Sequence, residues 1–102
     1  YIDGIAPVIS LACAAEIGGL DLGANPYGYG VDIWLSLRAQ RSGWGVWVDD
    51  ARVVRHKYHE TAKGEAGFLP RAAEAENAYL SERLGGDWRK DLATMQTTLE
   101  YI

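Results

Sequence analysis

The sequence predicts a small α/β domain, built from short strands and helices, that ends in a pair of helices. Two patterns predict this fold class. Apolar residues recur every three or four positions in the segments 31–41, 69–84 and 88–102, as on the buried face of a helix. Over residues 44–48 the positions of Trp44, Val46 and Val48 alternate with those of Gly45 and Trp47, as on the two faces of a strand. With 102 residues, 48% of them hydrophobic, the chain is long enough for one domain with a core.

The first thirty residues predict a strand, a helix and a loop. Residues 1–10 are expected to be extended, and Pro7 favours an edge or a bend. A short helix is expected over residues 11–17, because Gly18 and Gly19 then offer backbone positions free of Cβ strain. A loop over residues 20–30 follows from its turn-forming residues, which are Asp21, Gly23, Asn25, Pro26, Gly28 and Gly30. Because Tyr1 opens directly into an apolar segment, we expect a piece of a longer protein and no signal peptide.

The segment 31–41 is the clearest predicted helix. Its helical spacing places four residues on one face, namely Val31, Trp34, Leu35 and Arg38. Asp32 falls in the first turn, where the helix dipole favours negative charge, and Arg41 falls in the last turn, where it favours positive charge. Gly43 then ends the helix. Taken alone, the dipole would explain Asp32 without any function.

A hairpin is expected after this helix. The alternation over residues 44–48 predicts one strand, Asp49 and Asp50 predict a turn, and residues 51–56 predict a second strand. Period-two alternation would place Arg52, Val54 and His56 on one face. Residues 60–67 are polar and contain glycine, so a loop is expected there.

Two helices are expected to close the chain. The first covers residues 69–84, with Pro70 in the tolerated first turn and Gly85-Gly86 as its end. Its predicted buried face comprises Leu69, Ala72, Ala73, Glu76 and Leu80. Asp87 is expected to cap the second helix. The apolar stripe of that helix comprises Trp88, Leu92, Met95, Leu99 and Ile102.

Composition and charge exclude several classes of function. A net charge of −4 disfavours a broad nucleic-acid surface. The single cysteine, Cys13, excludes an internal disulfide and is typical of a reducing, cytoplasmic compartment. No apolar run approaches the roughly 18 residues of a membrane span. His56 and His59 fall short of the three or four ligands that a zinc site needs.

Five short segments in a fixed order resemble the acceptor-side, C-terminal half of a family 2 glycosyltransferase with the GT-A fold. Ile17-Gly18-Gly19-Leu20-Asp21 resembles the family's "iGgfD" segment, and Tyr27 to Asp32 resembles the loop that ends in its acidic motif. Leu37-Arg38 to Gly43 resembles the helix "lxxRxxxaG", Val46 to His56 resembles the hairpin ending in "vxH", and Tyr1 to Ser10 resembles the preceding strand. The resemblance covers residues 1–59. It divides the chain into a partial GT-A-like segment (1–60), a loop (61–67) and a C-terminal helical extension (68–102).

The resemblance implies an inverting transfer of a sugar from a nucleotide-sugar donor to a hydroxyl acceptor. Asp32 aligns with the catalytic base that deprotonates the acceptor hydroxyl, a role that suits a carboxylate ionised at neutral pH. His56 aligns with a histidine that reaches the divalent metal, Mn or Mg, or the donor diphosphate. Asp21, Tyr27 and Tyr29 are expected to line the acceptor pocket. The parent enzyme would be cytoplasmic or peripheral at the membrane.

The chain departs from the family pattern at two places. Val31 precedes the base where an acid is commoner, and the nucleotide-binding half with its DxD metal motif is absent. Asp49-Asp50 falls in the predicted turn and does not replace that motif. We therefore expect the isolated 102 residues not to catalyse transfer. The alternative is a stand-alone, non-catalytic binding or oligomerisation module, in which the residue 88–102 stripe or a second copy of the chain covers exposed apolar faces.

Overall fold

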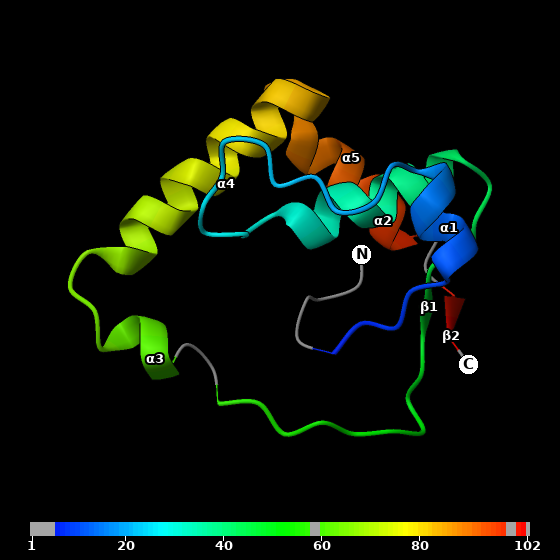
Figure 1. Ribbon diagram of the computed structural model, residues 1–102, viewed down its shortest axis with the longest axis horizontal. Helices are drawn as coiled ribbons and strands as arrows, with labels where there is room; N and C mark the ends of the chain where they lie inside the picture. Colours follow the sequence, from blue (N-terminus) through cyan, green and yellow to red (C-terminus); the bar gives the residue numbers. More distant parts are fainter. Residues whose placement is uncertain (1–5, 58–59, 98–99, 102) are drawn as a thin grey trace.

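The computed structural model describes residues 6–57, 60–97 and 100–101, which form a mostly helical chain (Figure 1). In chain order the elements are α1 (Leu11–Glu16), α2 (Val31–Arg41), β1 (Trp47–Val48), α3 (Glu60–Lys63), α4 (Phe68–Leu84), α5 (Trp88–Thr97) and β2 (Glu100–Tyr101). None of the helices in this part of the chain is both long and apolar enough to cross a bilayer.

The main core lies where α2, α4 and α5 meet. Its buried residues are Val31, Ile33, Leu37, Tyr79, Leu80, Trp88 and Met95. Leu80 has no exposed surface, and the partly buried Trp34, Leu84 and Leu92 pack against the cluster. The predicted C-terminal helical pair is thereby confirmed, although α5 ends at Thr97. Two members of its predicted stripe, Leu99 and Ile102, lie outside the described residues.

Helix α2 has the predicted bounds but is more buried than its pattern indicated. Gly30 precedes it with φ +86°, a left-handed conformation that favours glycine. Ile33 and Leu37, which the predicted face omitted, are buried. Helix α2 is buried on two sides. Ile33 and Leu37 belong to the main core, and Ala39 belongs to a second cluster with Cys13 and Val46.

The second cluster joins α1 to the end of α2. Ser10 caps α1 by accepting a hydrogen bond from the Cys13 amide at 3.4 Å, and the predicted helix over residues 11–17 is confirmed to within one residue. Ile17 and Trp44 pack around this cluster. A mostly apolar cavity of about 150 Å³ lies between α1, α2 and the segment 44–47.

The predicted hairpin is wrong. Strand β1 contains two residues and pairs in parallel with β2, in the register Trp47 to Glu100 and Val48 to Tyr101. Residues 51–56 form no strand, so Arg52, Val54 and His56 share no strand face. The prediction failed because alternation does not specify the partner of a strand. Here the partner is residues 100–101, which were predicted to belong to the last helix. The predicted turn is confirmed, since the Asp49 carboxylate accepts a hydrogen bond from the Ala51 amide at 2.9 Å.

Two further predictions of local structure need correction. Residues 6–10 form no strand, and residues 1–5 lie outside the described part of the chain. Helix α3 occupies Glu60–Lys63, within the segment expected to be a loop. The chain is therefore a helical assembly with one short parallel strand pair in its described residues, rather than an α/β layer structure.

Candidate functional site

The loop 21–30 carries most of the predicted site residues, and it runs along α4 (Figure 1). Asp21 contacts the last turns of α4 at Arg83. Tyr27 and Tyr29 contact its first residue, Phe68. Gly30 then lies against the helix between these two places, where an added Cβ would come within 3.1 Å of Glu76 Cγ, in the middle of α4, and of Leu80 Cδ1, one turn further on. The loop is thus in contact with α4 along much of the length of that helix.

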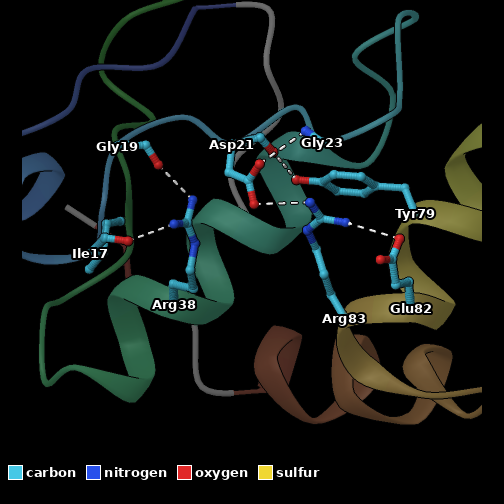
Figure 2. Close-up of polar contacts among 8 residues, drawn as sticks. All are labelled: Ile17, Gly19, Asp21, Gly23, Arg38, Tyr79, Glu82 and Arg83. Atoms are coloured by element: carbon cyan, nitrogen blue, oxygen red, sulfur yellow. Dashed lines mark hydrogen bonds and ion pairs between the residues drawn. The ribbon is translucent and has the colours of Figure 1, made fainter.

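Asp21 is held at the start of the loop by bonds to both its carboxylate and its carbonyl oxygen. Its Oδ1 accepts from the Gly23 amide at 2.9 Å, and its Oδ2 accepts from Arg83 Nη2 at 2.9 Å (Figure 2). The Tyr79 hydroxyl donates to the Asp21 carbonyl oxygen. The hydrogen bond from Arg83 and then that from Gly23 lower the pKa of the Asp21 carboxyl. Burial raises the pKa of Tyr79.

Arg38 fixes the chain just before Asp21. Its guanidinium donates from Nη1 to the Ile17 carbonyl and from Nη2 to the Gly19 carbonyl, both at 2.6 Å (Figure 2). The same group lies 5.3 Å from the centroid of the Trp34 ring. The segment 17–23 is therefore bound on one side by α2 and on the other by α4. Sequence reasoning placed Arg38 on one face of the predicted helix and missed this contact.

Tyr27 and Tyr29 form an aromatic cluster with Phe68. Both tyrosine rings meet Phe68 edge to face, with centroids 5.4 Å and 6.2 Å apart. Asn25, which is buried, fixes the backbone between them by donating to the Tyr29 carbonyl at 2.7 Å and accepting from the Tyr27 amide at 3.2 Å. Phe68 was not predicted as a site residue. The only signal for it was an aromatic residue at the start of the predicted helix.

Asp32 lies in the first turn of α2, directly after this loop, and is half-buried. Its Oδ1 accepts from the Ile33 amide at 2.9 Å, and its carbonyl accepts from Ser36 Oγ at 2.8 Å. Glu76 of α4 is its acidic neighbour: burial and then the charge of Asp32 raise the pKa of Glu76. Sequence reasoning had assigned Glu76 only to a helix face.

His56 lies apart from these residues. It is exposed in the segment that follows β1, and it makes no hydrogen bond or ion pair with any described residue. His59, its predicted companion, lies outside the described residues. Within the described ranges, no three His, Cys, Asp or Glu side chains are grouped as a metal would need. The described residues therefore place Tyr27 and Tyr29 in the loop that leads into α2, with Asp32 in the first turn of that helix, and they do not add His56.

The side chains of Asp32, Tyr27 and Tyr29 are of types that can bind a ligand with hydroxyl groups and accept a proton from it. A carboxylate such as Asp32 accepts a proton from a hydroxyl group that comes within hydrogen-bond distance. Aromatic rings such as those of Tyr27 and Tyr29 pack against apolar faces of a ligand, and their hydroxyl groups form hydrogen bonds at the same time. A polyhydroxylated ligand presents both kinds of surface.

Comparisons with known proteins give relatives but no family. No family model and no solved structure matches the chain. The chain is 36% identical over 67 residues to uncharacterized proteins of Mycobacterium bovis and Mycobacterium tuberculosis, covering 65% of this chain and 26% of each of them. It is 28% identical over 93 residues to the N-acetylglucosaminyl-diphospho-decaprenol L-rhamnosyltransferase of Mycobacterium tuberculosis, covering 90% of this chain and 30% of that protein. The chain thus spans less than a third of these relatives, and over most of its own length it is distantly similar to a glycosyltransferase.

Proposed function

We propose that these residues form the acceptor-side part of a glycosyltransferase of family 2 with the GT-A fold. In this proposal the enzyme moves a sugar, with inversion, from a nucleotide-sugar donor to a hydroxyl acceptor. The position of Asp32 carries the proposal: a half-buried carboxylate follows directly on a loop that presents two tyrosines. The similarity to a rhamnosyltransferase over 90% of the chain supports it. Asp32 is the proposed base that takes the proton of the acceptor hydroxyl.

The acceptor that we propose is a sugar linked to a lipid diphosphate. The name of the rhamnosyltransferase relative gives such an acceptor, N-acetylglucosaminyl-diphospho-decaprenol, and a deoxysugar, L-rhamnose, as the transferred group. Tyr27 and Tyr29 would pack against the acceptor sugar, and Asp21 would border the same site. His56 would face the donor diphosphate. A divalent metal, Mn or Mg, belongs to the same proposal, but the described residues offer only His56 toward it, so we assign no step to the metal.

The test uses the full natural chain that contains these residues. Transfer from nucleotide-activated L-rhamnose to a short-chain N-acetylglucosaminyl-diphospho-prenol is followed by mass spectrometry. Asp32→Asn keeps the size of the side chain and removes the base, so we expect kcat to fall by about 100-fold or more while the acceptor KM changes little. Loss of charge in the first turn of α2 should cost only about 0.5 kcal/mol of folding stability.

Asp87→Asn is the matched control, because Asp87 is also an acid at a helix start and forms an exposed ion pair with Lys90 at 3.2 Å. It should leave kcat unchanged. If Asp32→Asn keeps more than about a tenth of the wild-type kcat, Asp32 is not the base. If the wild-type chain transfers no sugar from any nucleotide donor, the proposed function is wrong.

The exposed apolar side chains favour a second candidate, a non-catalytic binding or oligomerisation module. Val8 is 95% exposed and Leu11 86% exposed, and Val8 borders the apolar cavity beside α1. A partner could cover these side chains. Light scattering on the 102-residue chain, with calorimetry of nucleotide diphosphate binding on the same sample, separates the candidates. A dimer that binds no nucleotide favours the module, and a monomer that binds one favours the enzyme.

A further inference from the structure

Helix α4 contacts the loop 21–30 at three separate places. Arg83 binds Asp21 near the C-terminal end of the helix, Glu76 in its middle lies against Gly30, and Phe68 meets Tyr27 and Tyr29 at its N-terminal end. The residues of α4 lie outside the segment 1–59 on which the glycosyltransferase resemblance rested. The helix therefore belongs to the surroundings of the site, although no motif pointed to it.

We propose that α4 is the positioning element of the acceptor loop, with Arg83 and Phe68 as its two positioning residues. The inference rests on the proposed function, since it assigns a role in binding the acceptor. Neither residue touches the reacting atoms in this proposal. Both act through Asp21, Tyr27 and Tyr29, which they hold in place.

Arg83 is well placed to hold the loop rigidly. Its side chain is only 15% exposed, and its guanidinium stacks 3.9 Å from the centroid of the Tyr79 ring. That stacking fixes the guanidinium while it donates to Asp21, and Tyr79 donates to the carbonyl of the same residue. A charge-assisted hydrogen bond from a guanidinium fixed in this way restrains the loop more firmly than an exposed surface ion pair does.

Phe68 restrains the opposite end of the loop. Its ring meets both tyrosine rings at interplanar angles of 79° and 74°. Edge-to-face contacts of this kind fix the orientation of the rings as well as their distance. Because the two tyrosines are the proposed acceptor contacts, a shift of Phe68 would change the surface on which the acceptor sugar lies.

The consequence for the reaction follows from the position of Asp32, two residues beyond the loop. A displacement of about 1 Å in a bound substrate can cost on the order of 100-fold in rate. Release of Arg83 or Phe68 would displace the acceptor relative to Asp32 without touching the donor. The expected signature is therefore selective for the acceptor.

The experiment measures transfer and loop protection in the full natural chain. Arg83→Gln and Phe68→Leu should each raise the acceptor KM by about 10-fold or more, with the donor KM unchanged. Hydrogen exchange at the Gly23 and Tyr27 amides, both bonded within the loop, should become faster in the same variants. Arg83→Lys keeps the ion pair and should recover part of the acceptor KM. Asp21→Asn should add little to the effect of Arg83→Gln, because both changes weaken the same contact, the hydrogen bond between Arg83 and Asp21.

Arg41→Gln is the matched control, since it breaks an exposed ion pair with Asp91 at 3.8 Å elsewhere in the fold. It should change neither KM. Equal rises in donor and acceptor KM, or wild-type exchange rates at Gly23 in Arg83→Gln, would overturn the proposal. If the wild-type chain transfers no sugar, the proposed function fails, and the exchange rates alone decide whether α4 positions the loop.

Discussion

Replacement of Gly30 by alanine tests the close approach of the loop to α4. Gly30 has φ +86°, and a Cβ there would lie 3.1 Å from Glu76 Cγ and from Leu80 Cδ1. The left-handed conformation costs an alanine about 1 to 2 kcal/mol. Overpacking against Leu80, which is fully buried, adds about 1 to 3 kcal/mol. We therefore expect Gly30→Ala to lower the free energy of unfolding by about 2 to 5 kcal/mol, a large share of the roughly 5 to 15 kcal/mol typical of a domain.

Gly28→Ala separates the two contributions. Gly28 has φ +76°, and an added Cβ would meet no atom within 4 Å, so this change carries the conformational cost alone. Urea unfolding of the wild type and both variants, followed by tryptophan fluorescence, gives the free energies. Gly30→Ala should be the less stable of the two by about 1 to 3 kcal/mol. Equal stabilities would refute the packing of Gly30 against α4.

Two further predictions concern the interior side of α4. Leu80→Ala should cost about 2 to 5 kcal/mol in urea unfolding because Leu80 is fully buried. Leu20→Ala, at a side chain that is 67% exposed, should stay within about 0.5 kcal/mol of the wild type. Burial and the charge of Asp32 raise the pKa of Glu76, so its ionised form is disfavoured in the folded state and destabilises the fold at neutral pH. Glu76→Gln should therefore raise the Tm at pH 7, and the gain should shrink as the pH falls and Glu76 of the wild type takes up a proton. The positive charge of Arg89 acts in the opposite direction and lowers the pKa of Glu76. A lower Tm for Glu76→Gln at pH 7 would mean that Arg89 stabilises the charge of Glu76 by more than burial and Asp32 destabilise it.

The helices could be predicted because their signals are local. The glycine at residue 43, the proline at residue 70 and the repeat of apolar residues every three or four positions act within one or two turns. They gave the bounds of α2 without error and those of α4 to within one residue. The loop 20–30 was predicted for the same reason, because its turn-forming residues restrict their own backbone.

The contacts between distant segments could not be predicted. Arg83 and Asp21 are 62 residues apart, and nothing near either residue indicates the other. The alternation over 44–48 suggested a hairpin because a strand without a known partner is assigned to its neighbour. The chain pairs β1 with residues 100–101 instead. Sequence reasoning named candidate site residues that lie in one loop or directly after it, and it missed their neighbours Phe68, Arg83 and Glu76 because these come from α4.

The contact between Asp21 and Arg83 also sets an order of events during protein synthesis. Asp21 is made 62 residues before its partner. At about 5 to 20 residues per second, the ribosome needs about 3 to 12 s to add that stretch. Before residue 68 is made, the nascent loop 21–30 has none of its contacts with α4. Phe68 then becomes available to the two tyrosines, and Arg83 becomes available to Asp21 last. The loop can make all of these contacts only after almost the whole of α4 has been translated, so a premature stop before residue 83 would leave a chain in which Asp21 lacks its hydrogen bond from Arg83.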